Sequence, residues 1–244
     1  MSAKSAILLV LAVFALTLLI RLPADVVTWL LPRSIACESP GGTLWHGGCA
    51  EVRSGTLALA DVGWTLHPLS LLRAQAALDV NSNDPRARGS AQLTLHFNGD
   101  LEVAALNGSL PLEGGVVPVP AGWSGVLDLG VDRASLRDGH VSALQGTLTA
   151  RSLRMAHPGT DLGSFELTFP AAPVGDAPML GTLRDLGGPL SLAGQLQLRR
   201  DGAFELDGTV APRDVPSADL QQVLNLLGPP DAAGRHPVSF AGTY

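Results

Sequence analysis

Length, composition and charge already limit what this chain can be. Its 244 residues, 46% hydrophobic and 16% charged, suffice for one or two domains with a substantial core and argue against a disordered chain. The formal charge of −6 lacks the basic excess that neutralises phosphates, so we expect no nucleic-acid partner. Its 28 Gly and 18 Pro are too many for a helical bundle and predict a mainly β protein.

An apolar segment lies at the N-terminus. Residues 6–20 carry no charge and stand between Lys4 and Arg21. As a helix they would cover about 23 Å of a hydrocarbon core about 30 Å thick, so the predicted transmembrane anchor extends over 6–22 and leaves a short cytoplasmic tail at 1–5. A cleaved secretory signal is the alternative. We favour the uncleaved anchor, because no small-x-small cleavage site follows the apolar run.

The two cysteines indicate the compartment, which the basic residues flanking the anchor do not fix. Cys37 and Cys49 lie twelve positions apart with four glycines between them, a spacing that predicts a disulfide. A single pair beyond a membrane anchor favours an oxidising compartment such as the bacterial periplasm. Two separate buried thiols are the alternative. No metal site is expected, because no other Cys or His stands at ligand spacing.

Residues 23–49 are the expected membrane-proximal part, made of a helix and the disulfide loop. Residues 23–31 have helical spacing and stop at Pro32, which predicts a short amphipathic helix on the membrane surface with Trp29 at the interface. The remaining residues, 50–244, are predicted to form a periplasmic β domain.

Alternating residues and turn dipeptides organise that β domain. Apolar and polar residues alternate in many runs, as over 93–97, which predicts strands with one solvated face. Three dipeptides between such runs predict two-residue hairpins joining antiparallel neighbours, namely Asn98-Gly99, Asp138-Gly139 and Asp201-Gly202.

Two segments interrupt the alternation. Residues 111–125 are rich in Pro and Gly and are predicted to form a crossing loop that splits the sheet into two halves. Further on, Ser217 is expected to cap a short helix that ends at Gly228 and covers one open end or face of the sheet. The predicted fold is therefore a curved, partly open antiparallel β-sheet or β-sandwich-like domain with a short C-terminal helix.

Catalytic patterns are not found in the sequence. It has no G-x-S-x-G string, its histidines stand singly, and no glycine-rich string leads from a strand into a helix. We therefore predict no catalytic, cofactor-binding or metal-binding residue and no enzyme. Four arginines between 130 and 155 form a candidate basic patch, for which a solvated face is favoured over partner docking: Arg133, Arg137, Arg151 and Arg154.

Five sequence blocks, in order, resemble a known family. GGTLWHGGCA at 41–50 and VGWTLHPLSLLRAQAALDV at 62–80 resemble the G-T-x-W-x-G and W-x-L-x-P-x-x-L patterns of type II secretion system protein N. Blocks at 127–139, 186–213 and 223–242 follow in the same order, so the resemblance covers almost the whole chain. The cysteine pair departs from the family pattern. The positions matching its motifs, with an expected structural role, are Gly42, Thr43, Trp45, Gly47, Trp64, Pro68, Gly228 and Gly234.

That resemblance implies a function and a location. It implies an accessory, single-pass subunit of the bacterial inner membrane, with most of the chain in the periplasm, that acts as a non-catalytic scaffold during export of folded proteins. The implied partners are inner-membrane platform subunits, membrane lipid and, as a further candidate, the outer-membrane secretin; no cofactor is implied. The family is also distantly similar to AsmA-like proteins with lipid-handling grooves, which gives lipid binding or carriage as the alternative function.

The two motif tryptophans also have an expected place from the residues alone. Trp64 shares the phase of Val62 and Leu66 and is expected to be buried. Trp45 lies among glycines in a loop and is expected to plug one end of the core.

Overall fold

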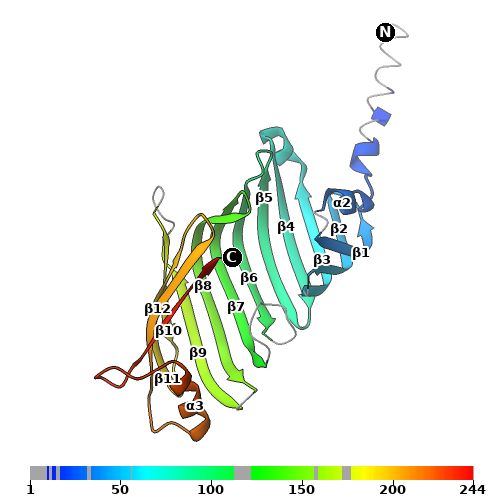
Figure 1. The fold of residues 1–244 in the computed structure, drawn as a ribbon. Helices are drawn as coiled ribbons and strands as arrows, with labels where there is room; N and C mark the ends of the chain where they lie inside the picture. Colours follow the sequence, from blue (N-terminus) through cyan, green and yellow to red (C-terminus); the bar gives the residue numbers. More distant parts are fainter. Residues whose placement is uncertain are drawn as a thin grey trace.

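Each strand pairs with the next one along the chain. The computed structural model describes residues 10, 13–14, 17–31, 34–55, 57–112, 122–156, 159–171 and 177–243. Within these residues, 13 strands form one antiparallel sheet in sequence order (Figure 1). The sheet is therefore an open meander, in which each outer strand, β1 or β13, pairs with a single described neighbour.

The bounds of the elements are as follows. The strands are β1 (Ile35–Gly42), β2 (His46–Ser54), β3 (Leu57–His67), β4 (Gln75–Asp84), β5 (Ala87–His96), β6 (Leu101–Pro111), β7 (Trp123–Arg137), β8 (His140–Met155), β9 (Thr160–Phe169), β10 (Met179–Asp185), β11 (Leu190–Leu198), β12 (Ala203–Pro212) and β13 (His236–Thr243). The helical segments with described bounds are α2 (Asp25–Leu30), the 3-10 helix η1 (Pro68–Arg73) and α3 (Ala218–Leu226).

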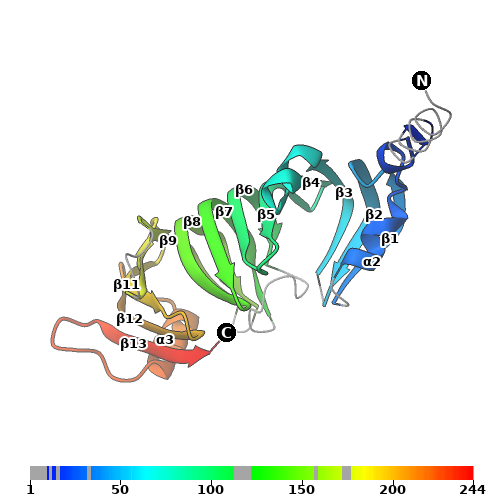
Figure 2. The ribbon, with the colours of Figure 1, turned by 90° about the horizontal axis from the view of Figure 1, so that it is seen from above.

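One face of the sheet carries a row of paired residues that, apart from Ser82, are apolar or glycine. A single row of paired residues crosses all 13 strands, and we call the face that carries it the apolar face. Seen from above, the sheet is an arc, and α2 and α3 lie near its two ends (Figure 2). The row consists of Pro40, Cys49, Val62, Ser82, Gly89, Gly108, Leu129, Leu148, Leu167, Leu183, Gly194, Gly208 and Val238.

The two helices bury the ends of the apolar face. Leu220 and Leu224 of α3 pack into a cluster with Phe165 of β9, and burying each leucine contributes about 1.5–3 kcal/mol. At the other end, Val27 of α2 packs on a smaller cluster that contains Trp64. The sheet is thus covered by a helix where it begins and by another where it ends.

Partly exposed side chains of neighbouring strands form ion pairs. Arg151 of β8 pairs with Asp128 of β7, and Arg184 of β10 pairs with Glu166 of β9, both contacts being partly exposed. Exposed pairs of this kind contribute little to stability, typically about 0–1 kcal/mol each. Their main effect is to neutralise charge locally on a sheet whose stability comes from its apolar face.

The predicted β class and antiparallel pairing are confirmed. Asp138-Gly139 forms a two-residue hairpin, with φ of +50° and +81°, between the paired residues Arg137 and His140. The connections at Asn98-Gly99 and Asp201-Gly202 also join antiparallel neighbours, but they are longer than two residues. The three dipeptides therefore predicted correctly where the chain reverses direction, but only one of them predicted the length of the turn.

The prediction that residues 111–125 split the sheet is wrong. Strands β6 and β7, which flank this segment, pair directly from Leu101 with Leu136 to Pro111 with Val126. Residues 113–121 lie outside the described residues. The predicted β-sandwich alternative is also replaced by a single open sheet. Proline and glycine composition indicates a connection but says nothing about which strands it joins.

The predicted helices are found in part. Ser217 caps α3, its hydroxyl accepting a hydrogen bond from the Leu220 N–H at 3.2 Å, as predicted. Within 23–31 the helix is α2, and Trp29 is exposed. Much of the expected anchor lies outside the described residues. In the part of the chain that is described, we find no helix with the length and apolar character needed to cross a membrane.

A buried carboxylate joins β3 to the turn between β4 and β5. Asp84 is 1% exposed and accepts hydrogen bonds from the backbone N–H groups of Ala60 at 3.0 Å and Arg86 at 2.8 Å. These two bonds, with that from the Arg86 guanidinium, lower the pKa of Asp84 to about 2. The carboxylate is therefore charged in the folded protein at neutral pH.

We predict that Asp84→Asn destabilises the sheet and changes its acid response. The folded pKa lies below the ordinary value of 3.8, so the stabilisation by the carboxylate is complete above that value and is lost as pH falls towards about 2. The variant should unfold several degrees lower at neutral pH and lack this part of the acid-induced loss. Thermal unfolding followed by circular dichroism from neutral pH to about pH 2 measures both effects.

Asp79→Asn is the matched control, because Asp79 lies on the same strand with an exposed carboxylate. Equal unfolding temperatures and acid profiles for the two variants would contradict the role given to Asp84.

Candidate functional site

The turn between β1 and β2 fastens the N-terminal segment to the sheet. The Trp45 indole N–H donates to the Leu19 carbonyl at 2.8 Å, and the Leu44 N–H donates to the Leu22 carbonyl at 2.9 Å. The Ala24 N–H donates to the Gly42 carbonyl at 3.2 Å. Three hydrogen bonds thus join the turn to residues 19–24, where the apolar segment ends.

Glycine is required at both ends of this turn. Gly42 has φ of +87°, and a Cβ there would lie 2.6 Å from the His46 carbonyl oxygen. Between the glycines, the Thr43 N–H donates to the His46 carbonyl at 2.9 Å, and the His46 N–H donates to the Thr43 hydroxyl at 3.1 Å. The G-T-x-W-x-G pattern therefore closes a tight turn whose tryptophan is directed towards the N-terminal segment.

Trp64 of β3 packs against the second glycine of the pattern. A Cβ on Gly47 would lie 2.7 Å from Cζ2 of Trp64, so the indole occupies the space that a side chain would need. The Trp64 indole N–H donates to the Leu44 carbonyl at 3.0 Å, and the residue is 7% exposed. The predicted burial of Trp64 is confirmed. Trp45 does not plug the core as expected, because its indole bonds to Leu19.

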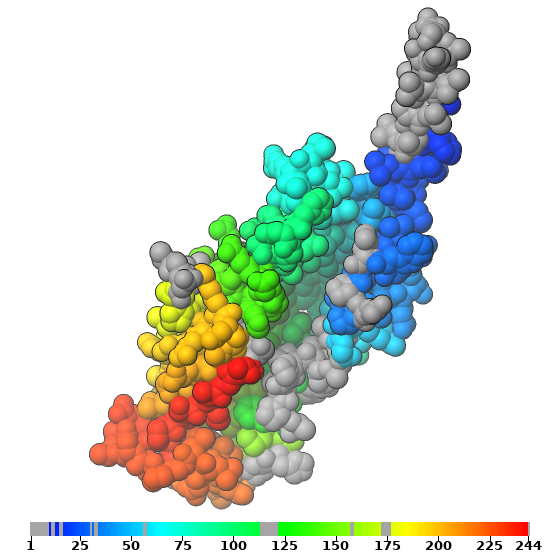
Figure 3. Space-filling view, turned by 45° about the horizontal axis from the view of Figure 1, so that its top comes forward, coloured from blue at the N-terminus to red at the C-terminus, as the bar shows by residue number. Residues whose placement is uncertain are grey.

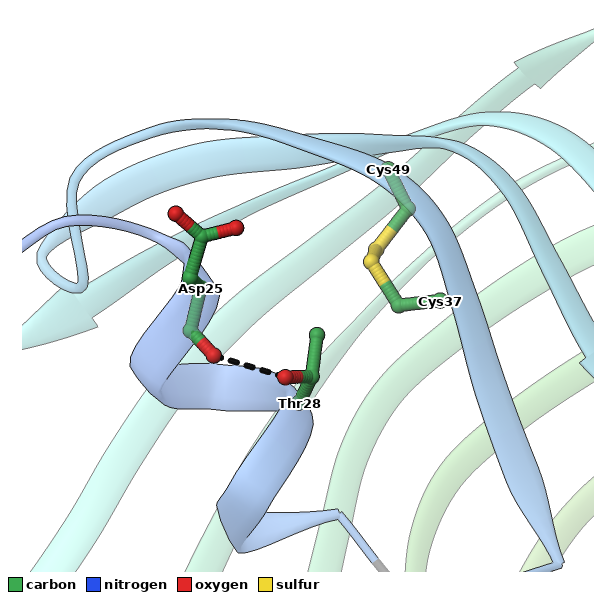
Figure 4. Close-up of a disulfide and its surroundings, with 4 residues drawn as sticks. All are labelled: Asp25, Thr28, Cys37 and Cys49. Carbon is green, nitrogen blue, oxygen red and sulfur yellow. Dashed lines mark hydrogen bonds between the residues drawn. A yellow bond between two sulfur atoms is a disulfide. The ribbon is translucent and has the colours of Figure 1, made fainter.

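The predicted disulfide is confirmed. Cys37 of β1 and Cys49 of β2 are bonded, with 5.5 Å between their Cα atoms (Figure 4). The bond lies beside α2, in which the Thr28 hydroxyl donates to the Asp25 carbonyl at 2.7 Å. Closing so short a loop contributes about 3 kcal/mol by the chain-entropy estimate. The disulfide therefore reinforces the hairpin that holds the N-terminal segment.

A cavity lined only by apolar residues lies where α2 covers the apolar face. Its volume is about 310 Å³, and its wall is formed by α2 and by strands β1 to β5. Val27 and Leu31 line it from the helix side, and Trp64 and Leu78 line it from the sheet. The sequence predicted which residues of these strands face the apolar side, but it did not predict this hollow. Alternation indicates the face on which a side chain lies, and it does not indicate how closely a helix packs against that face.

A second hollow continues the first along the sheet. It measures about 160 Å³ and shares Val62 and Val80 with the first cavity. Gly89 and Gly108, paired across β5 and β6, line it, and at these two positions its wall has no side chain. Figure 3 shows the molecule hollowed between its N-terminal and C-terminal parts. The apolar face thus has free space in the region between its two covering helices.

The remaining motif residues shape connections. Pro68 begins η1, directly after β3. Gly228 follows α3 with φ of +97°, and its carbonyl accepts a hydrogen bond from the buried His236 at 2.7 Å. Gly234, with φ of +75°, lies in the turn in which Asp231 and Arg235 pair. Gly228 and Gly234 lie far from the β1–β2 turn along the sheet, so the motif positions do not form one site.

The described residues contain no group of three or more His, Cys, Asp or Glu side chains placed to hold a metal ion. The candidate basic patch is partly neutralised, since Arg137 pairs with Asp100 at 3.4 Å and Arg151 pairs with Asp128. The arrangement therefore offers surfaces for binding: a turn fastened to the N-terminal segment, a hollow apolar face and open sheet edges.

Comparison with known proteins assigns the family. The model of the family "Type II secretion system (T2SS), protein N" matches residues 34–239. This chain belongs to the type II secretion system protein N family. The match covers the β1–β2 turn, the disulfide, strands β1 to β12 and β13 as far as Ser239, so the sheet described above is the structure of the family region in this chain.

Two relatives match over almost the full chain. Type II secretion system protein N of Aeromonas hydrophila is 27% identical over 239 residues, covering 92% of this chain and 92% of the relative. The protein of the same name from Vibrio cholerae is 26% identical over 239 residues, covering 93% and 92%. No solved structure shows significant similarity to the chain.

We predict that Gly47→Ala destabilises the protein by about 1–3 kcal/mol, the usual cost of overpacking. The new Cβ would lie 2.6 Å from the Gly41 carbonyl oxygen and 2.7 Å from the Trp64 ring, so the turn or the indole must shift. Urea unfolding of the full chain measures the loss. Gly41→Ala is the matched control, because its Cβ meets nothing within 4 Å. Equal destabilisation by both substitutions would refute the packing of Trp64 on Gly47.

Proposed function

We propose that this chain is an accessory inner-membrane subunit of the type II secretion system. In this proposal residues 6–22 anchor the chain, the sheet lies in the periplasm, and the protein acts as a non-catalytic scaffold for inner-membrane platform subunits during export of folded proteins. The observation that carries the proposal is the family match over residues 34–239. The outer-membrane secretin is a further proposed partner.

The disulfide and the N-terminal segment support the proposed location. Structural disulfides persist in oxidising compartments such as the periplasm, and Cys37–Cys49 joins the two strands nearest the proposed anchor. The described residues of the apolar segment have exposed side chains, including Phe14 at 61% and Ile20 at 59%. Large apolar side chains exposed together on one segment favour a lipid or protein environment over water.

The outer edge of β13 is the proposed contact surface for a secretion subunit. Among the residues that the structure describes, β13 pairs with β12 alone, so the N–H and C=O groups along its other edge are proposed to be available for strand addition. Most of its residues are exposed, including Phe240 at 56%. An open edge with an exposed aromatic side chain gives a partner both backbone hydrogen bonds and apolar area.

We predict that a photo-cross-linking amino acid at Phe240 captures a platform subunit in cells that contain the complete secretion system. Mass spectrometry of the adduct identifies the partner. The same amino acid at Asp132, which is exposed in the middle of the sheet on β7, is the control and should give no such adduct. Recovery of no secretion subunit, either by cross-linking or by co-purification from intact membranes, would contradict the scaffold function.

Lipid binding is the second candidate function. The observation that favours it is the cavity of about 310 Å³ whose whole wall is apolar. This volume is at the lower end of the range of about 300–1,000 Å³ for small-molecule sites. A wall without polar groups offers no hydrogen bonds, so the ligand that fits is a hydrocarbon chain such as that of a membrane lipid.

We predict for this second function that phospholipid remains bound when the full chain is extracted gently and analysed by native mass spectrometry. Val80→Phe should reduce the bound lipid, because Val80 lines both hollows of the apolar face. Gln92→Phe, which adds the same ring at an exposed position of β5, should leave it unchanged. A protein free of lipid, or equal lipid in both variants, would refute lipid carriage by this cavity.

A further inference from the structure

The end of the sheet next to the proposed anchor carries two adjacent connections. In an antiparallel meander, alternate turns lie at the same end, so the β1–β2 turn, η1 and the β5–β6 turn share one end. We call η1 together with residues 97–100 the anchor-side edge. Figure 1 shows the β3–β4 connection at the end of the sheet from which the N-terminal segment extends. The hydrogen bonds of Leu19 and Leu22 to the β1–β2 turn fix this end of the sheet to the apolar segment.

Large apolar side chains protrude from the anchor-side edge. Leu69 is 76% exposed, Leu72 is 85% exposed and Phe97 is 71% exposed. The two connections adjoin, because the Phe97 N–H donates to the carbonyl of Ala74, the residue that follows η1, at 3.4 Å. Three such side chains on neighbouring turns form an apolar patch, which on a folded protein marks a contact surface.

The backbone beneath this patch is held in place. The Ser70 hydroxyl donates to the His67 carbonyl at 2.6 Å and accepts from the Ala77 N–H at 2.9 Å, so η1 is fastened to β4. Ser70 is 9% exposed, whereas its neighbour Leu69 points outwards. The leucines are thus exposed on a fixed turn and not on a loose loop that would fold them back.

Two arginines lie near the patch, and Asp100, the carboxylate within the edge, pairs with Arg137 at 3.4 Å. Arg73 ends η1, and Arg21 follows the apolar segment at the same end of the sheet. Long basic side chains beside apolar residues place their stems in the hydrocarbon boundary and their charges among lipid phosphates. An apolar centre with arginines beside it, continuous with an apolar segment, has the composition of a membrane-contacting surface.

We propose that the anchor-side edge lies in the surface of the bilayer, with Leu69, Leu72 and Phe97 inserted among the lipids. This inference rests on the proposed anchoring of residues 6–22 and adds a second point of membrane contact. With two contacts, the sheet cannot rotate freely about its anchor. The apolar face and the β13 edge are thereby held at fixed orientations to the membrane.

Depth measurements on the full chain in vesicles of phosphatidylethanolamine and phosphatidylglycerol test the proposal. Because Cys37 and Cys49 are bonded to each other, one introduced cysteine can carry a nitrobenzoxadiazole label alone. Labels on Leu69→Cys, Leu72→Cys and Phe97→Cys should show blue-shifted emission and quenching by lipids with a doxyl group in the acyl chain. Val215→Cys and Leu226→Cys, 96% and 82% exposed at the opposite end, are matched controls and should show neither.

Each outcome separates the edge from the anchor. If the chain does not float with vesicles, the anchor is refuted and this inference with it. If the chain floats but labels at 69, 72 and 97 respond like the controls, only the edge contact is refuted. Protection of these sites that requires added platform subunits would likewise overturn it in favour of a protein contact.

A second measurement needs no substitution. Photoactivatable phospholipid in the same vesicles should form adducts with the unmodified chain at residues 68–73 and 97–100, and none at residues 213–227. Adducts spread evenly over both ends of the sheet would overturn the proposal.

Discussion

An open sheet with one apolar face has to be covered, and the rest of this structure follows from that constraint. A closed barrel or a sandwich buries its apolar side chains against other strands, but a single meander of 13 strands has none to use. Here α2 and α3 cover the two ends, and Leu224 of α3 is only 1% exposed against the sheet. Between them the face is hollow, and paired glycines on β5 and β6 deepen it. The same constraint that requires the helices thus leaves a space that a ligand or partner can fill.

The alternation of residues was sufficient to predict the strands and their solvated face, and the turn dipeptides predicted their antiparallel pairing. Neither pattern was sufficient for the strand order, because neither shows whether the strands on the two sides of a long connection lie next to each other. The segment 111–125 shows this: its composition indicated a break, yet β6 and β7 on either side of it are direct neighbours. The alternation is also interrupted within strands at residues such as Ser39 and Asp61, which have positive φ values. After such a residue, the positions that face the apolar side change from odd to even numbers or the reverse. Such irregularities leave no clear signal in a single sequence.

The candidate site was predictable only as a pattern. The resemblance to protein N identified Gly42, Trp45, Gly47 and Trp64, and the spacing of two cysteines predicted their bond. Why these residue types are needed becomes evident only when β3 is placed beside β2, because the Trp64 indole then occupies the space above Gly47. Asp84 shows the same limit. As one acidic residue among 22 it has no distinguishing neighbour in sequence, and its hydrogen bond to Ala60 spans two strands.

Orientation links the two proposed functions. A scaffold has to present its β13 edge at a constant height and angle to subunits in the same membrane, and a lipid carrier has to open its apolar face towards the bilayer. Neither is achieved if the sheet can turn freely about a single anchor.

The β1–β2 turn fixes the sheet to residues 19–24 through Leu44 and Trp45, and the disulfide holds the strands of that hairpin together. The anchor-side edge supplies the second contact that sets the angle. Leu95, 48% exposed on β5 next to Phe97, extends the apolar surface from that edge towards Leu93, which lines the larger cavity. A sheet held in this way has its hollow face continuous with the membrane surface and its far edge, 12 strands along, available to a partner.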